Sequence, residues 1–538
     1  MKINFIKSSI LLGAVLSFTA CTNLELEETD SIFREDAGGG FSGVSDVPSA
    51  LVNSYDQIRG QLDTQENLYA LQEVTSDEML VPTRGTDWGD NGLWRTLHQH
   101  TWDPNHQFIL NTWNAYNRNV FNLSEIIAPE SNANAQQLAE AKFLRAFSMF
   151  WVMDLFGQVP FREVDEGASI NPRVMSRSEA FDFIMQDLTD ALPNLPGTGP
   201  GPNANFASKA SAHYLMAKIL LNKHIYLGNP EAAAADMTAV VTHVDAIAGF
   251  GFGLQSGYFE IFRPAVDTET IWFTNTGVGS RMWNGLHYFQ TVPDNTGGGW
   301  NGFSTLAEFY ELFEGSPEHN HPDAGQEERR GFVPYEGTRV GTGTGYFAGG
   351  KDTPQGDAGP DGFVDGSDIG IGFLFGQNYK LDGSMAVDRG GNPLYFTKEL
   401  PGLLGNNERT GIRVLKYHPS NGAYTGHMIL FRYADAYLMK AEAIMRGGTG
   451  GESALVLVNR LRELREASPL GSLSEQDMLD ERGRELYIEM WRRQDLVRFG
   501  KFTEAWEFKP ATEDFRNLFP IPSIALNSNP NLVQNEGY

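Results

Sequence analysis

The chain has almost no cysteine: Cys21 is the only one in 538 residues. A single thiol excludes an internal disulfide. Before Cys21 come two lysines, an apolar run over residues 10–18 and a small residue directly in front of the cysteine. This pattern is typical of a lipoprotein signal, so we predict a signal peptide over residues 1–20, cleavage before Cys21 and lipid attached to its thiol. Residues 21–45, which are polar, acidic and glycine-containing, are then a flexible tether.

Two other interpretations of the leader stay open. Phe18 stands where lipoprotein signals prefer leucine, so one alternative is an ordinary secretory signal with an incidental cysteine. The other is a transmembrane helix, but the apolar run is far shorter than the ~20 residues that cross a bilayer. No later segment of the sequence offers a membrane span.

Basic residues are also scarce. The chain has 41 Lys and Arg against 68 Asp and Glu, a net charge of −27. A surface this acidic repels phosphate backbones and other polyanions. The composition therefore speaks against nucleic acid as a partner and favours a neutral ligand.

Catalytic motifs are missing as well. The sequence has no Gly-x-Ser-x-Gly elbow, no His-Glu-x-x-His helix and no Cys-His pairing. None of these motifs therefore supplies a candidate catalytic residue.

What the sequence does contain is helical periodicity, with apolar residues at three- and four-residue spacing through residues 46–248. Amphipathic helices in pairs, with small residues where partners meet, are typical of a tetratricopeptide-like stack, although the repeat of about 34 residues is not legible here. We predict a mainly α fold whose N-terminal part is such a stack. The expected helices cover residues 47–62, 113–127, 135–156, 178–192, 209–227 and 230–247.

From residue 249 to 426 the periodicity gives way to glycine, aromatic and acidic residues. Because a structureless stretch of this length is rare in a compact domain, we predict an ordered, loop-rich ligand-binding subdomain with short strands. Residues 427–538 return to helical periodicity and are expected to complete the stack. The strands are expected at residues 270–274 and 411–415, the later helices at 428–445, 454–465 and 475–499, and the Pro- and Asn-rich tail at 519–538 is expected to contain no helix.

Four motifs along the chain are shared with a known family. They are Ala-Glu-Ala-Lys-Phe-Leu-Arg-Ala at 139–146 with Phe-Gly-Gln-Val-Pro at 156–160, Phe-Arg-Tyr-Ala-Asp at 431–435 with Lys-Ala-Glu-Ala at 440–443, Asp-Glu-Arg-Gly-Arg-Glu-Leu at 480–486 with Asp-Leu-Val-Arg-Phe-Gly-Lys at 495–501, and the ending from Phe-Pro-Ile-Pro at 519–522 to Gly-Tyr at 537–538. In this order, behind a lipoprotein signal, they resemble the SusD/RagB family of outer-membrane lipoproteins of glycan-degrading bacteria. The resemblance covers essentially the whole chain.

The resemblance implies a role in nutrient capture. Members of this family are not enzymes, lie over a SusC-like TonB-dependent transporter at the cell surface, and pass a bound glycan to its barrel. For this chain it implies a lipid anchor in the outer membrane, surface exposure and a neutral oligo- or polysaccharide as ligand. The alternatives are a peptide-binding importer of the same fold, as in the RagB branch, and a surface hydrolase, for which no motif places a nucleophile.

The charges within the family motifs are predicted to form ion pairs that hold the last helices to the stack. The alternative for Glu481, Glu485 and Glu489 is a catalytic carboxylate pair, but their spacing is that of any solvated helix face. The expected ion-pair members are Arg432, Asp435, Glu442, Arg482 and Arg493.

A first candidate ligand site is the loop at residues 84–94. Neutral sugars present apolar C–H faces and hydroxyl edges, so they need exposed aromatic rings beside polar side chains. Trp88 joins no helical stripe, and by resemblance family members carry a binding aromatic in the corresponding loop. We predict Trp88 as the main platform, with polar partners Arg84, Asp87, Asp90 and Asn91.

A second candidate is the segment at residues 281–302. Here Trp283, Tyr288 and Trp300 are predicted platforms and Asn301 a hydrogen-bonding partner. The alternative for Trp300 is packing onto a following helix at residues 306–313. The tryptophans expected in the core are Trp102, Trp113 and Trp151.

Metal binding is a lesser possibility, and no other cofactor is expected. Four acidic residues between glycines suggest structural calcium, although their spacing departs from the Asp-x-Asp-x-Asp-Gly loop. His98 and His100 flank one residue and suggest zinc, but no third ligand is apparent. The calcium candidates are Asp357, Asp361, Asp365 and Asp368.

Overall fold

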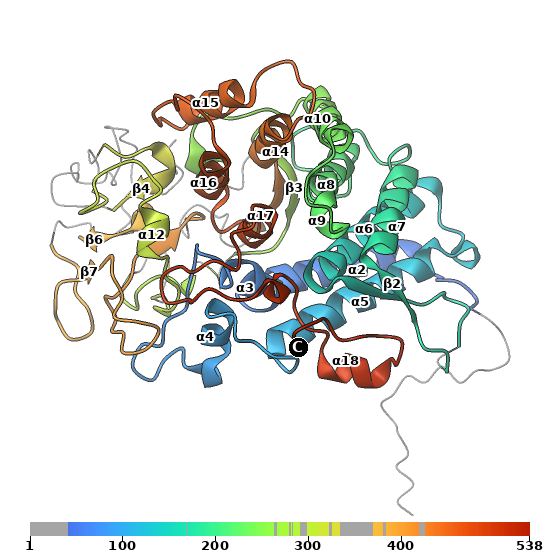
Figure 1. Ribbon diagram of the computed structural model, residues 1–538, viewed down its shortest axis with the longest axis horizontal. Helices are drawn as coiled ribbons and strands as arrows, with labels where there is room; N and C mark the ends of the chain where they lie inside the picture. The colour runs from blue at the N-terminus through green and yellow to red at the C-terminus, as the bar shows by residue number, and fades with distance from the viewer. Residues whose placement is uncertain are drawn as a thin grey trace, which may run out of the picture. The chain divides into compact units, whose positions relative to one another are not determined.

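Helices packed in neighbouring pairs form most of the chain before residue 250 (Figure 1). α5 packs on α6 and α6 on α7, and α8 then packs on α10. The expectations for residues 47–62 and 135–156 are confirmed to the residue. The helices are α2 (Val47–Leu62), α3 (Asn67–Glu73), α4 (Leu93–His98), α5 (Gln107–Ile127), α6 (Ala135–Phe156), α7 (Arg177–Ala191), α8 (Lys209–Leu221), α9 (Lys223–Tyr226) and α10 (Ala234–Gly249).

This computed structural model describes residues 41–538 except 168, 263–265, 279–280, 282, 291–297, 322–324, 334–368, 380–383 and 419–425. The predicted signal peptide, Cys21 and the four calcium candidates lie outside the described residues. Gly43–Tyr538 forms one compact unit. None of the helices in the described part of the chain has the length and apolar character that a bilayer crossing requires.

Local signals set the helix ends. α6 begins with a capping box, in which the Asn134 side chain accepts from the backbone N–H of Gln137 and the Gln137 side chain accepts from that of Asn134. It ends at Gly157, whose φ of +70° is the left-handed conformation that glycine adopts without a Cβ penalty. Because such signals are local, the bounds of this helix can be predicted from the sequence.

The C-terminal helices continue the stack, since α14 packs against both α8 and α10, and α15 and α16 pack against α14 (Figure 1). The protein is thus mainly α with a tetratricopeptide-like helical stack, as predicted. The later helices are α12 (Ala307–Tyr310), α14 (Tyr433–Met445), α15 (Ala454–Leu464), α16 (Glu475–Leu486), α17 (Arg492–Arg498) and α18 (Ser523–Ser528).

Three expectations about these helices are wrong. Residues 428–432 are a strand and not the start of a helix, because this apolar run pairs with a second buried strand. Residues 487–491 interrupt the expected helix at 475–499, with positive φ angles at Ile488 and Met490. The tail contains the short helix α18.

The interruption at 487–491 is held by two buried carboxylates from the other end of the chain. The backbone N–H of Met490 donates to Glu73 Oε1 at 2.5 Å, and that of Ile488 donates to Glu78. These two N–H groups therefore donate to side-chain carboxylates and not to the backbone carbonyls of a continuous helix. A contact across more than 400 residues leaves no local signal.

The loop-rich part carries short antiparallel strands, as predicted. β3 pairs with β9, which joins this part directly to α14; the predicted strand at 270–274 is confirmed, and that at 411–415 is shorter. Outside the loop-rich part, β1 (Gln158–Phe161) pairs with β2 (Arg173–Ser176). The other strands form the pairs β3–β9 and β6–β7 and the sheet β4–β5–β8. Their bounds are β3 (Thr270–Thr274), β4 (Gly331–Phe332), β5 (Ile371–Leu374), β6 (Gly376–Gln377), β7 (Tyr395–Phe396), β8 (Arg413–Leu415) and β9 (Met428–Arg432).

The predicted ion pairs are confirmed and form a buried network. Arg482 bonds Asp435 and Asp495 at 2.8 Å each, and Arg498 bonds Glu442 at 2.7 Å. The remaining predicted members pair as Arg432 with Glu269, Glu485 and Glu489, and Arg493 with Asp154. Because every one of these side chains is buried, loss of one partner leaves a charge without compensation.

The network predicts a loss of stability in acid. Burial alone would raise the pKa of Glu442, but Arg498, Arg446 and Arg482 outweigh it and lower the pKa to about 2. A lowered folded-state pKa stabilises above the unfolded value near 4.5, and this contribution disappears as the pH falls toward 2. We expect Glu442 to contribute on the order of 3 kcal/mol to this loss. Urea unfolding at a series of pH values measures it, and a free energy of unfolding that stays constant from pH 5 to pH 2 contradicts it.

Candidate ligand-binding site

The two candidate segments, almost two hundred residues apart in sequence, meet in the structure. The indole N–H of Trp88 donates to the backbone carbonyl of Trp300 at 2.9 Å, and the Tyr288 hydroxyl donates to Asp87 Oδ2 at 2.8 Å. The two segments are therefore joined at one place. The name aromatic patch is used here for four aromatic residues of these segments, Trp88, Tyr288, Phe289 and Trp300.

Trp300 and Phe289 are the most exposed rings of the aromatic patch. Their exposed fractions are 63% and 55%. The backbone N–H of Trp300 donates to the carbonyl of Trp283 at 3.1 Å, and that of Gly299 donates to His287 at 2.9 Å. Trp300 is thus fixed by its backbone while its ring stays in solvent, so the alternative of packing onto a following helix is not observed.

Trp88 is half-buried, unlike the freely exposed platform that the sequence suggests. Its ring packs edge-on against Phe303 and Trp94, with centroid distances of 5.6 Å and 6.1 Å. A Cβ on Gly302 would lie 2.3 Å from the indole, so only glycine permits this close approach. Trp88 therefore supports the Trp300 loop in addition to presenting part of its own surface.

Arg84 and Asn301 lie inside the loop packing. The Arg84 guanidinium donates to the carbonyls of Asn407 at 2.7 Å and Thr410 at 2.8 Å, and burial lowers its pKa to about 9. Asn301 is fully buried and its Oδ1 accepts from Arg413 at 2.8 Å. The expectation that these two side chains take ligand hydroxyls does not fit their positions, because both are buried. Their hydrogen bonds to residues 407, 410 and 413 position the patch instead.

The other predicted residues differ in exposure. Asp87, Asp90 and Asn91 are exposed, and Asp90 Oδ2 accepts from the Trp94 indole at 2.7 Å. Trp283 is half-buried against the core, below the Trp300 backbone. Asp87 is thus the predicted carboxylate that touches a patch ring directly.

The sequence did not reveal the ion pair between Arg389 and Glu408 that lies beside Tyr288. The Arg389 guanidinium lies 4.0 Å from the centroid of the Tyr288 ring and bonds Glu408 Oε1 at 2.5 Å. Glu408 in turn bonds His287 Nε2 at 2.9 Å. Arg389 follows Tyr288 by about a hundred residues, so no local pattern marks it. Burial and the bond to Asp87 raise the pKa of Tyr288 to about 12, so its hydroxyl stays protonated.

The histidine pair considered for zinc is bonded to backbone. His98 Nε2 contacts the carbonyl of Glu507 at 2.9 Å, and His100 Nε2 contacts that of Thr75 at 2.8 Å. Within the described ranges, no group of three or more His, Cys, Asp or Glu side chains is placed to hold a metal ion. The calcium hypothesis concerns residues outside those ranges.

The carboxylates considered for catalysis are buried among arginines. Glu481 bonds Arg329 at 2.8 Å, and Glu485 and Glu489 each bond Arg432 at 2.7 Å. Substrate therefore has no access to them.

The expectation of core positions is confirmed for the three tryptophans, which are buried: Trp102, Trp113 and Trp151.

Comparison with known proteins gives a consistent result. Residues 268–538 match the SusD family, and residues 91–204 match the family described as "Starch-binding associating with outer membrane". The starch-binding protein SusD of Bacteroides thetaiotaomicron is 26% identical over 611 aligned positions that cover all of both chains. The SusD-like protein P38 of Formosa agariphila is 27% identical, covering 75% of this chain and 74% of its own.

Solved structures share the fold. A laminarin-binding SusD-like protein superposes with a TM-score of 0.64 at 20% identity, covering 93% of this chain and all of that one. Surface glycan-binding protein A of Bacteroides thetaiotaomicron, in complex with laminarihexaose, has a TM-score of 0.60 at 17% identity, covering 91% of this chain and 98% of its own. Both matches extend through the helical stack and the loop-rich part.

Proposed function

Since this chain belongs to the SusD family, we propose that it is a binding protein that captures a neutral oligo- or polysaccharide on the aromatic patch and delivers it to a SusC-like TonB-dependent transporter. It does so from the cell surface, anchored in the outer membrane by lipid on Cys21. It carries out no catalysis.

The exposure of Trp300 and Phe289 beside Tyr288 is the observation that supports this proposal most. Large exposed rings are uncommon on protein surfaces outside binding sites, and a sugar ring can cover such a ring with its C–H face. Asp87 and Arg389 supply acceptors and donors for hydroxyl groups at the edge of the patch. A platform with polar groups around it fits a neutral sugar chain.

Suitable probes follow from the relatives. One is named as starch-binding and another as laminarin-binding, so maltohexaose and laminarihexaose represent the two linkages. Both probes are uncharged, in keeping with the acidic composition of the chain.

Trp300→Ala is expected to weaken binding of the cognate oligosaccharide while leaving the melting temperature unchanged, because the ring lies in solvent. By analogy with stacked bases, an aromatic platform contributes roughly 1–3 kcal/mol, or about fivefold to over a hundredfold in Kd. Isothermal titration with each probe, at low and high salt, measures the effect. Affinity should vary little with salt, because no ion pair forms with a neutral ligand.

The matched control is Phe206→Ala, which removes an exposed ring outside the patch and should bind like the parent. Trp300→Ala with the parent's affinity would show that the sugar binds elsewhere. A parent that binds neither probe but binds extended peptides would instead identify a peptide importer of the same fold.

Cys21→Ser is expected to move the protein from the membrane fraction into soluble material, because lipid can then no longer be attached. Immunoblotting of fractionated cells measures the distribution. The cells must lack the transporter, so that the partner does not retain the protein. Unchanged membrane retention under these conditions contradicts the anchor.

A further inference from the structure

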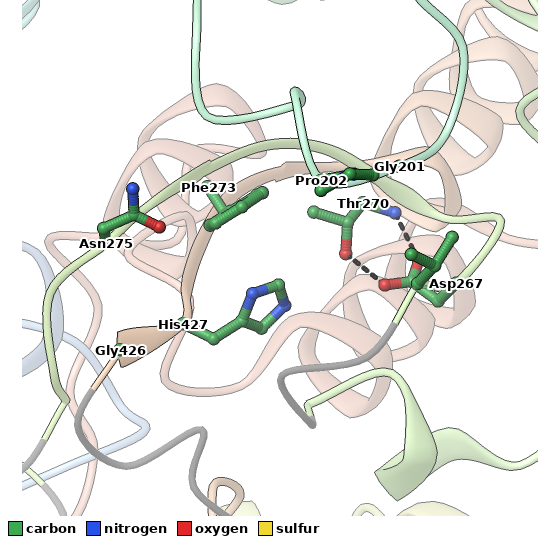
Figure 2. A pocket seen from close by; sticks show the side chains of 9 residues that line it. Gly201, Pro202, Asp267, Thr270, Phe273, Asn275, Gly426 and His427 are labelled. Carbon is green, nitrogen blue, oxygen red and sulfur yellow. Dashed lines mark hydrogen bonds between the residues drawn. The ribbon is translucent and has the colours of Figure 1, made fainter.

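A hollow with a volume of about 260 Å³ lies over the β3–β9 pair (Figure 2). It shares no residue with the aromatic patch. It is also smaller than the sites of drug-sized ligands, which begin at roughly 300 Å³, so it suits a single ring. The lining residues are Gly201, Pro202, Val266, Asp267, Thr270, Phe273, Asn275, Gly426 and His427.

An irregularity in β3 builds this hollow. In a regular strand, Thr270 and Phe273 would point to opposite faces. The pairing register shifts on both sides of Trp272, and Thr270 and Phe273 both line the hollow while Trp272 is buried in the core. Bulges of this kind re-aim side chains and are common beside binding sites.

His427 provides an unused hydrogen-bonding atom in the hollow. The residue is 5% exposed, and its Nε2 has no hydrogen-bond partner among the residues that the structure describes. Figure 2 shows the imidazole pointing into the space between Phe273 and Asp267, and its ring centroid lies 4.6 Å from that of Phe273. Burial lowers the pKa of His427 to about 4, so the ring is neutral at physiological pH. A buried polar atom without a partner is costly unless a ligand or water satisfies it.

The charges of the lining favour a neutral ligand. Asp267 is the one charged side chain among the lining residues that the structure describes. Its carboxylate accepts from the backbone N–H groups of Glu269 and Thr270 at 2.7 Å and 2.6 Å and from the Thr270 hydroxyl at 2.6 Å, so it is already satisfied. An anion finds no positive charge among the described lining residues, and the Asp267 oxygens that a cation would need are already engaged by three donors.

The other lining residues form one apolar side and one polar side. Phe273, Val266 and Pro202 provide an apolar wall, whereas the Asn275 amide, which is exposed, and His427 Nε2 provide polar contacts. An apolar wall with a few polar groups matches a sugar ring, which has an apolar face and hydroxyl edges. We propose that this hollow is a second binding site, separate from the aromatic patch, that takes one neutral sugar ring with a hydroxyl bonded to His427 Nε2.

Saturation-transfer NMR on the whole protein tests the proposal, with D-glucose, D-galactose and D-mannose as probes. At least one of these sugars should bind the parent. His427→Phe keeps an aromatic ring against Phe273 but removes Nε2, and it should weaken binding about five- to tenfold, the usual effect of one lost hydrogen bond. Asn275→Ala, a change at an exposed position, should weaken the same sugar without disturbing the fold.

Trp300→Ala is the control that separates this site from the aromatic patch. It should leave binding of the single sugar unchanged even where it abolishes binding of the oligosaccharide. The inference is overturned if no probe sugar binds the parent, if both His427→Phe and Asn275→Ala bind as the parent does, or if Trp300→Ala alone removes the signal. Loss of oligosaccharide binding in Trp300→Ala with retained monosaccharide binding supports both sites, and each site can fail without the other.

Discussion

Arg432→Ala is expected to lower the free energy of unfolding by about 3–5 kcal/mol, because it removes one side of a buried charge network. Arg432 bonds Glu269 at 3.0 Å and both Glu485 and Glu489 at 2.7 Å. The three carboxylates come from the residue before β3 and from α16 and the segment after it. Without the guanidinium, neighbouring negative charges stay buried and repel one another. Guanidinium chloride unfolding measures the difference.

The matched control is Arg460→Ala, which breaks a pair with Glu452 at 2.6 Å that is about half exposed on both sides. Exposed pairs contribute roughly 0–1 kcal/mol, so this variant should unfold nearly like the parent. Equal losses in the two variants would mean that the buried network does not hold β9 and α16 together.

Trp151→Ala is expected to reduce mainly stability, and Trp88→Ala mainly oligosaccharide binding. Trp151 is buried in α6 and stacks on Trp491 at 5.6 Å, so its loss should cost about 3–5 kcal/mol of stability. Trp88 is half-buried, and its ring supports the Trp300 loop through the 2.9 Å bond to that backbone carbonyl. Its truncation should cost less stability but weaken oligosaccharide binding about fivefold to over a hundredfold.

Melting temperature and isothermal titration, measured on both variants, separate the two roles. If Trp88→Ala lowers the melting temperature as much as Trp151→Ala does, Trp88 is part of the core. If it binds the oligosaccharide as tightly as the parent, the ligand rests on Trp300 and Phe289 without it.

Much of the helical stack was predictable from sequence because its signals are local. Apolar spacing and caps define α2 and α6 within a few turns of chain. The same holds for the core position of Trp151, which lies on an apolar stripe. The family motifs added the ion pairs, since charged residues such as Arg482 lie at fixed positions in them.

Contacts between distant segments decided the rest. Residues 428–432 became β9 because β3 offers a partner strand, and the helix after Glu475 is broken where Glu73 and Glu78 bind its backbone. The residues of β9 and of the helix break carry no local pattern that predicts either effect.

The candidate site shows the same division. Composition and loop position pointed to Trp88 and Trp300 separately, because an aromatic residue in a polar loop is visible in the chain itself. Only the tertiary structure joined them, buried Arg84 beneath them and brought Arg389 to Tyr288. Side-chain burial and the meeting of loops depend on which distant backbone groups satisfy each polar atom, and one-dimensional patterning carries no information about that.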